Sequence, residues 1–427
     1  MTGRRIMISG GRVIDPANGI DGVMPVYVAK GKIAGVGVKP EGFQPDQEIS
    51  AAGHIVCPGF VDLCARLREP GSEQEATIAS ETLAAAAGGI TTLCCPPDTF
   101  PVIDTPAVIQ LLMDRAESVG KSRILPIGAL TRGLAGTELS EMSALKDAGA
   151  IAVSNASLAL ANPLVHRRAL EYAASYDLLV MIRPEDPWLR NGGCAHEGEM
   201  ATKLGLPGIP TSAETVAVAQ SLALIEAVGG RAHFCQLSSE RAVEMIAEAR
   251  SRGVPVTADV AAHHTDLTEG ALDGFNANAH VNPPLRTEVD RAGLRRGVAN
   301  GALQAICSDH QPHDLDAKLD AFPATEPGVS ALEALLPLTL RLVSQGVVDL
   351  STAIERLTAG PARVLGIASG TLSLGVPADI CIFDPDLDWQ VDTPLWLSRG
   401  HNTPYWGDVM RGRVTHTLLG GRVIFRL

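Results

Sequence analysis

The sequence predicts an α/β protein in which a (β/α)8 TIM barrel is joined to a small β-sandwich built from both ends of the chain. Eight apolar, strand-like runs alternate with helix-like segments through the middle of the chain, which is the pattern of such a barrel. The first and last fifty residues instead show short strands separated by glycine turns, and GGRVI occurs at both 10–14 and 420–424. We therefore assign 1–54 and 366–427 to a composite sandwich domain, and 55–365 to the barrel.

The barrel assignment depends on the order of its elements. The strand-like runs are at 55–63, 90–95, 123–130, 150–154, 178–182, 232–237, 254–259 and 303–307. Helices are predicted between most of them, for example at 72–87, 105–119, 162–175 and 213–228. In this fold the chemistry lies at the C-terminal ends of the strands, so the residues at those ends decide the function.

Composition excludes several classes of protein. Of 427 residues 46% are hydrophobic, and 35 Lys and Arg against 48 Asp and Glu give a net charge of −13. This balance excludes intrinsic disorder and argues against a nucleic-acid or anionic-membrane surface. The N-terminal residues lack the apolar stretch of a signal peptide, and the longest uncharged run, Ala148 to Val165, is interrupted by polar residues. Eight cysteines without a CxxC pair favour a reduced, cytoplasmic protein.

One segment carries a family resemblance. PGFVDLCARLREPG (58–71) resembles the dihydroorotase signature PGFVDxHxHxREPG of the amidohydrolase superfamily. Further landmarks follow in the family's order, namely GGITTLCCPPDTFPVID (88–104), RPEDPWL (183–189), HFCQLSS (233–239), VNPPLR (281–286), SDHQPH (308–313) and PADICIFDP (377–385). The resemblance implies a barrel with a terminal sandwich, and hydrolysis or formation of a cyclic amide by zinc-activated water.

The positions that would bind zinc have changed. The resemblance implies histidines at four strand-end positions and a carboxylate at a fifth position. This chain has Cys64, Arg66, Asn155, Arg183 and Gln236 there, and retains only Asp309. A guanidinium stays protonated and has no lone pair to donate, so it cannot bind a cation. We therefore predict a pseudoenzyme with no catalytic residues, no metal and no cofactor.

The positions implied to bind substrate are mixed. Arg68, Asn282 and His313 match the family pattern, whereas Asp98 stands where an Asn is expected. A carboxylate at that position would repel anionic dihydroorotate instead of donating a hydrogen bond to it. We interpret these four residues as a vestigial substrate pocket.

The arginines Arg66, Arg68 and Arg183 allow two interpretations. They could form an anion-binding pocket in place of the zinc site, or a plug neutralised by Asp309, Asp98 or Glu185. We favour the plug, because buried charges must be paired.

Two further groups of side chains are interpreted as structural and not as reactive. Inert packing is favoured over redox chemistry for Cys64 and Cys235. The acidic segment 73–75 is assigned to the N-terminus of the helix at 72–87, where the helix dipole favours negative charge.

Three functions follow from these observations. The first is an inactive dihydroorotase homologue in pyrimidine biosynthesis that assembles with the aspartate carbamoyltransferase catalytic chain, as a homo-oligomer within a hetero-oligomer. The resemblance implies this role, because some bacteria use a non-catalytic dihydroorotase-like chain in that way. The second is a single-metal or metal-free amidohydrolase acting on a cyclic amide through His263, His264, Asp309 and His313. The third is a ligand-sensing module using the arginines.

Overall fold

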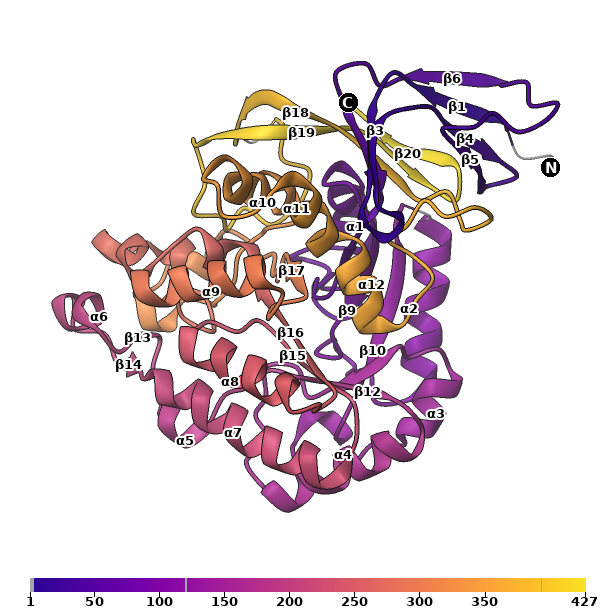
Figure 1. Cartoon of the computed structure of the whole chain (residues 1–427). Coiled ribbons are helices and arrows are strands. Elements are labelled where there is room, and N and C mark those ends of the chain that lie inside the picture. The colour runs from indigo at the N-terminus through magenta and orange to yellow at the C-terminus, as the bar shows by residue number, and fades with distance from the viewer. Residues whose placement is uncertain (1–3, 120, 393) are drawn as a thin grey trace.

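The computed structural model describes residues 4–119, 121–392 and 394–427, and it contains the predicted barrel and sandwich (Figure 1). Eight parallel strands form one sheet in the order β17-β16-β15-β12-β11-β10-β9-β8. Their bounds are β8 (Phe60–Asp62), β9 (Ile90–Cys95), β10 (Arg123–Ala129), β11 (Ala152–Ser154), β12 (Leu179–Ile182), β15 (Ala232–Phe234), β16 (Val256–Ala261) and β17 (Ala305–Cys307). The predicted fold class is confirmed.

The barrel closes just beyond the ends of β8 and β17. A parallel bridge joins Ala65 to His310, and the Arg66 amide donates to the His310 carbonyl at 2.9 Å. The Ser308 amide donates to Asp62 Oδ1 at 2.9 Å from the opposite direction. This closure holds the segments after the first and last strands together, so residues 64–68 and 308–313 share one mouth.

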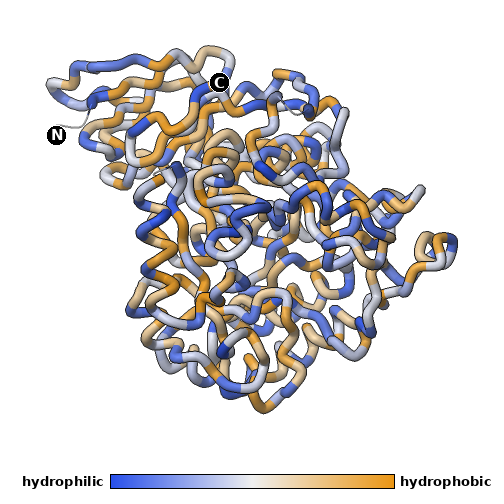
Figure 2. Tube along the Cα trace, turned by 180° about the vertical axis from the view of Figure 1, so that it is seen from behind, coloured by the Kyte–Doolittle hydropathy of each residue, from blue (hydrophilic) through white to orange (hydrophobic). Residues whose placement is uncertain are grey.

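Helices surround the barrel, and local sequence signals such as N-cap residues mark where helices begin. The helix α4 (Pro163–Ser175) begins at its N-cap Asn162, whose side chain accepts a hydrogen bond from the Leu164 amide. Polar and apolar residues alternate along the outer helices in Figure 2, as expected where one face is buried. The other helices are α1 (Ile78–Ala87), α2 (Pro106–Val119), α3 (Met142–Asp147), α5 (Pro187–Arg190), α6 (Glu199–Leu204), α7 (Thr211–Val228), α8 (Glu240–Ser251), α9 (Glu288–Asn300), α10 (Leu335–Ser344), α11 (Leu350–Leu357) and α12 (Ala359–Leu365).

Both ends of the chain build the sandwich. One sheet has the order β5-β4-β1-β6 and the other β20-β19-β18-β7-β2-β3. Apolar side chains from both sheets, including Ile8, Val28 and Ile382, form one buried cluster between them. The strands are β1 (Ile6–Ser9), β2 (Arg12–Asp15), β3 (Ile20–Val23), β4 (Val26–Ala29), β5 (Lys32–Val36), β6 (Gln47–Ser50), β7 (Ile55–Pro58), β18 (Ile380–Gln390), β19 (Val409–Leu419) and β20 (Arg422–Arg426). Separate from both, β13 (Ala195–His196) and β14 (Gly208–Ile209) pair as a ribbon.

Two predicted elements need correction. The run at 55–63 is two strands, because β7 pairs with β2 and β18 in the sandwich while β8 pairs with β9 in the barrel. The sandwich therefore extends to residue 58 rather than 54. The helix predicted at 72–87 begins only at Ile78, after the N-cap Thr77. The acidic segment 73–75 precedes the helix and is not part of its first turn.

A bilayer-spanning helix would need about 20 apolar residues. Among the described residues, no helix combines the length and hydrophobicity needed to cross a membrane.

Candidate functional site

Arg66 is the central side chain of the barrel mouth. It follows β8 and is only 8% exposed. Its Nε donates to Asp98 Oδ2 at 2.8 Å, its Nη1 lies 3.5 Å from Asp309 Oδ1, and its Nη2 donates to Ser157 at 3.0 Å. Burial alone would lower the pKa of Arg66, but Asp98, Cys64 and Asp309 raise it above its ordinary value. A permanent cation thus lies where the family pattern implies a metal ligand.

Cys64 and Asp309 pack beside that cation. The Cys64 Sγ lies 3.5 Å from Asp309 Oδ1 and 3.8 Å from Arg66 Nη1. Burial, reinforced by Asp309, raises the pKa of the Cys64 thiol well above its ordinary value. The thiol is therefore neutral near pH 7, and neutral thiols bind metals poorly. The Asp309 carboxylate also accepts from Gln311 at 3.3 Å, so its oxygens are occupied by protein donors.

Arg68 belongs to a second, adjoining group. Its Nε lies 3.2 Å from Glu75 Oε2 and donates to the Pro312 carbonyl at 2.8 Å, while its Nη2 lies 3.1 Å from His313 Nε2. His313 Nδ1 lies 3.0 Å from the same Glu75 oxygen. The vestigial pocket is thus divided, because Arg68 and His313 share Glu75 whereas Asp98 pairs with Arg66.

Arg183 differs from the other two arginines. It forms no ion pair with any residue that the structure describes, and its Nη2 is buried without a hydrogen-bond partner. Glu185, one of the predicted neutralising groups, instead lies 3.6 Å from Arg190. The favoured plug is therefore correct for Arg66, whose partners were predicted. It is correct for Arg68 only with a different carboxylate, Glu75, and it is wrong for Arg183.

The other substituted positions hold the backbone in place. Asn155 Nδ2 donates to the carbonyls of Leu134 and Leu158, and its Oδ1 accepts from Thr131 at 2.6 Å. The Gln236 backbone amide donates to Asp259 Oδ1 at 2.6 Å, and its side-chain Nε2 donates to Cys307 Sγ at 3.8 Å. Asn282 Oδ1 is buried without a hydrogen-bond partner among the described residues. At Asn155 and Gln236, side chains that could have met a metal or substrate are directed to protein groups.

Three residues of the mouth have left-handed backbone conformations. The φ angles of Arg68, Gln236 and Asp309 are 61°, 50° and 44°. Such conformations cost about 1–3 kcal/mol each in non-glycine residues and persist where surrounding structure enforces them. The mouth therefore keeps strained backbone at positions that the family pattern associates with chemistry.

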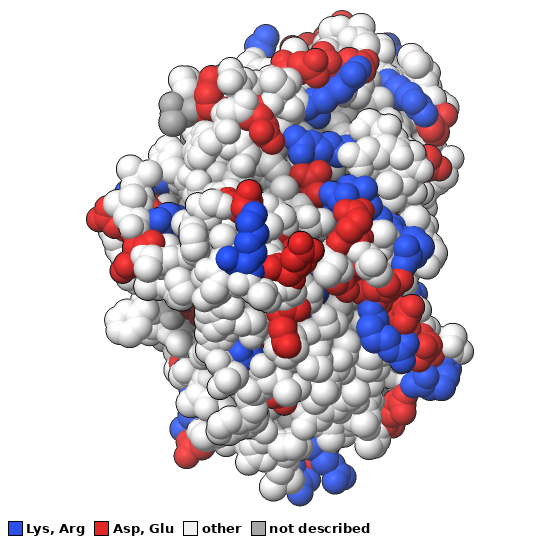
Figure 3. Space-filling view, turned by 90° about the vertical axis from the view of Figure 1, so that its left-hand side faces the viewer, with Lys and Arg blue, Asp and Glu red and all other residues white. Residues whose placement is uncertain are grey.

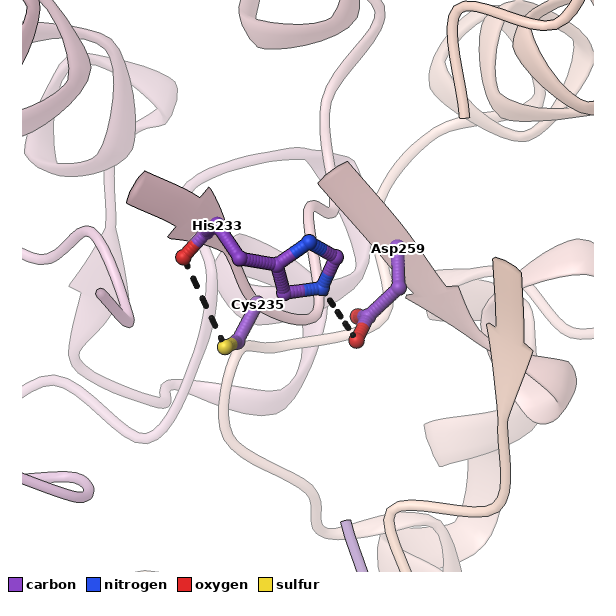
Figure 4. A group of neighbouring side chains, drawn as sticks. All are labelled: His233, Cys235 and Asp259. Carbon is purple, nitrogen blue, oxygen red and sulfur yellow. Dashed lines mark hydrogen bonds and ion pairs between the residues drawn. The ribbon is translucent and has the colours of Figure 1, made fainter. Parts of the chain in front are cut away.

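One further group has the composition of a metal site. His233, Cys235 and Asp259 lie close together, with ligand atoms within 4.8 Å of one another, and all three are buried (Figure 4). His233 Nε2 lies 3.0 Å from Asp259 Oδ2, and its Nδ1 lies 2.7 Å from Thr257 Oγ1. Burial raises the pKa of the Cys235 thiol well above its ordinary value. Hydrogen bonds within the protein thus satisfy both ring nitrogens, as in a packed core histidine.

The four residues of the single-metal hypothesis do not gather at one point. The His263 and His264 rings are tilted by 43° with their centroids 4.6 Å apart, and His264 Nε2 lies 3.0 Å from the Pro283 carbonyl. Burial lowers the pKa of His263 well below 6.5 and that of His264 to about 4. In the described part of the chain, neither joins Asp309 or His313 in a group of ligand atoms close enough to hold one ion.

Two residues of the site were missed by sequence reasoning. Glu75 pairs with Arg68 and His313, although its place in an acidic run suggested a helix terminus. Ser157 accepts from Arg66 across the mouth. The sequence offered no specific signal for either residue, because the three arginines already had three candidate carboxylates, Asp98, Asp309 and Glu185.

Comparison with known proteins confirms the resemblance. The family described as Dihydro-orotase-like matches residues 53–242. A dihydroorotase-like protein of Pseudomonas aeruginosa is 50% identical over 418 residues, covering 98% of this chain and 99% of that protein. A dihydroorotase of Anaeromyxobacter dehalogenans is 42% identical over 421 residues, covering 98% of this chain and 97% of that protein.

Solved structures agree on the fold. The L-hydantoinase from Arthrobacter aurescens superimposes with a TM-score of 0.87 at 22% identity, covering 99% of this chain and 96% of that one. The whole-length identity to the two bacterial proteins, together with the barrel and its signature segments, decides the family. This chain belongs to the dihydroorotase-like proteins of the amidohydrolase superfamily.

Proposed function

We propose that this chain is a catalytically inactive dihydroorotase homologue that serves as a structural and assembly subunit for aspartate carbamoyltransferase in de novo pyrimidine biosynthesis. The observation that carries the first part is the position of Arg66. Its guanidinium contacts both Cys64 and Asp309, two residues at positions where the family pattern implies metal ligands. A metal dication beside this permanent cation would be repelled, so these residues do not fit the family's zinc pair.

Pairing within the mouth supports the same conclusion. The carboxylates of Asp98, Asp309 and Glu75 each contact an arginine of the chain. Removing one partner of a buried ion pair lowers the stability of the fold, because the other charge is left buried and unpaired. These ion pairs therefore stabilise the folded scaffold as a set. The mouth thus has the interactions of a structural core at the place where an active relative would bind its metal.

The assembly role rests on the resemblance and is supported by the surface. Several large apolar side chains are strongly exposed, among them Trp188 at 81%, Phe100 at 79% and Leu319 at 77%. Figure 3 shows charges of both signs over the upper part of one face and down its right-hand side, and an area in the lower middle that carries few. Exposed aromatic and aliphatic side chains are typical of protein–protein interfaces.

Co-expression tests the partner directly. The tagged chain is expressed with the aspartate carbamoyltransferase chain of the same organism, purified through its tag and examined by gel filtration with light scattering. We expect both chains to co-elute in a fixed ratio, and transferase activity to follow that peak. The same tag on an unrelated (β/α)8 barrel is the control. Clean separation of the two chains, with a fully active transferase left behind, contradicts the proposal.

A further inference from the structure

A groove crosses the open side of the β-sandwich, between its two sheets. Its volume is about 720 Å³, which is enough for several residues of an extended peptide. The strand β6 supplies one wall, and β20 with the turn before it supplies the other (Figure 1). We call this the edge groove, and its lining includes Arg4, Gln47–Ser50, His416, Gly420, Gly421, Arg422 and Arg426.

The charge of the edge groove is opposite to that of the whole chain. Arg4, Arg422 and Arg426 line it, and none of the three forms an ion pair with a residue that the structure describes. His416 lies with them, and burial and then Arg426 lower its pKa. Among the lining residues that the structure describes, only Glu48 is acidic. In a chain with a net charge of −13, this concentration of unpaired arginines makes the groove complementary to an acidic ligand.

The walls of the groove also present unpaired backbone. Among the described strands, β6 pairs only with β1 and β20 only with β19, so each is the edge of its sheet. The amides of Gln47 and Ala51 donate to the carbonyls of Arg5 and Ser9 in and next to β1. Because alternate residues of a parallel strand bond to opposite sides, the backbone groups of Glu48 and Ser50 point away from β1. Edges of this kind can pair with another chain.

We propose that the edge groove binds an extended, acidic peptide segment of a partner protein, which adds to β6 as a further strand. The backbone of the peptide would satisfy the outward groups of Glu48 and Ser50, and its carboxylates would meet Arg4, Arg422 and Arg426. Backbone pairing supplies affinity in this mode of recognition, and the side-chain contacts supply specificity. The inference does not depend on the proposed function, because the carbamoyltransferase need not be the protein that carries the segment.

Peptide binding tests the charge complementarity. A fluorescein-labelled peptide of alternating Glu and Val is titrated with the full chain at low salt, and anisotropy is recorded. The peptide in which Lys replaces Glu is the ligand control. We expect only the acidic peptide to bind, and the R422E/R426E variant to bind it about tenfold more weakly, since two attractions become repulsions. The matched protein control is R167E/R168E, which reverses two exposed arginines on α4.

A second pair of variants tests strand addition. Glu48→Pro removes the outward N–H of β6 while leaving its bonds to β1, and proline is tolerated on edge strands in this orientation. We expect Glu48→Pro to lose peptide binding while its circular dichroism and melting temperature stay close to those of the wild type. Glu48→Ala keeps the N–H and should bind at least as well as the wild type.

Several results would overturn the inference. If the acidic peptide does not bind at low salt, the inference is wrong. It is also wrong if R422E/R426E and Glu48→Pro both bind the peptide as strongly as the wild type. Binding of single-stranded oligothymidine instead of the peptide would make the groove a nucleic-acid site. Charged residues on edge strands can also serve only to prevent edge-to-edge aggregation. In that case R422E/R426E would change self-association in light scattering and leave peptide binding unchanged.

Discussion

Arg66 Nε donates to Asp98 Oδ2 at 2.8 Å, which joins the segment after β8 to the segment after β9. Both residues depart from the family pattern, which implies a His and an Asn at these positions. Asp98 alone would be an unpaired charge at the barrel mouth, whereas Arg66 and Asp98 together form an ion pair. The cation that excludes a metal and the anion that disfavours dihydroorotate are therefore two halves of one structural interaction.

Removal of Arg66 should be costly. Arg66→Met leaves the buried carboxylate of Asp309 and the more exposed carboxylate of Asp98 without their cation. We expect the free energy of unfolding to fall by about 3–5 kcal/mol in urea titrations. The control is Arg12→Met, which breaks an ion pair with Asp21 whose side chains are 48% and 42% exposed. That change should cost no more than about 1 kcal/mol. Equal losses for the two variants would show that the Arg66 pair is not structural.

Removal of Arg183 should have the opposite effect. Its buried Nη2 has no hydrogen-bond partner in the described part of the chain, and leaving a donor in that state costs about 1–3 kcal/mol. We expect Arg183→Met, which keeps the length of the side chain, to leave the melting temperature unchanged or to raise it. A loss of stability as large as that of Arg66→Met would mean that Arg183 has a carboxylate partner in solution.

Acidification should destabilise the fold through a buried histidine. Burial lowers the pKa of His166 to about 4, from an ordinary value of 6.5. Between these values the unfolded chain binds a proton that the folded chain does not, so stability is full above pH 6.5 and falls as the pH drops toward 4. The contribution of this one residue is up to about 3 kcal/mol. In urea titrations between pH 4 and pH 6.5, the free energy of unfolding should depend less steeply on pH for His166→Asn than for the wild type.

The matched control for that titration is His54→Gln, since His54 is only partly buried. It should keep the pH dependence of the wild type. An unchanged slope in His166→Asn would show that the His166 side chain is solvated in the folded protein.

The junction between sandwich and barrel should tolerate no side chain at Gly59. A Cβ there would lie 2.3 Å from the Cγ2 and Oγ1 atoms of Thr91. We expect Gly59→Ala to lower the free energy of unfolding by about 1–3 kcal/mol through overpacking. Gly270→Ala is the control, because its Cβ would meet only Thr268 Oγ1 at 3.5 Å, and it should change stability by less than about 0.5 kcal/mol. Equal losses of stability for the two variants would show that the residues around Gly59 are packed less tightly than in the structure.

Much of the fold was predictable because periodicity and turn residues are local signals. The helix at 162–175 is an example, since an Asn–Pro pair marks its start and apolar spacing its buried face. The run at 55–63 was not predictable as two strands, because apolar residues continue from β7 into β8 and only Gly59 separates the two strands. Which sheet each strand joins depends on pairing with β18 and β9, which lie far away in the sequence.

The candidate site was likewise predictable only in part. The loss of metal ligands at Arg66 and Arg183 could be predicted, because the chemistry of a guanidinium does not depend on its surroundings. The partner of each arginine could not, because ion pairing depends on distances across the barrel mouth. Arg68 pairs with Glu75, which local sequence assigns to a helix terminus, and Arg183 has no carboxylate partner among the described residues.

The central claim is that this barrel mouth is a structural ion-pair cluster and not a metal centre. The most direct measurement combines zinc content by mass spectrometry with dihydroorotate turnover, on protein purified with zinc in every buffer. We predict no stoichiometric zinc and no turnover, for the wild type and for Asp309→Ala alike. Stoichiometric zinc in the wild type, with turnover that Asp309→Ala abolishes, would contradict the claim.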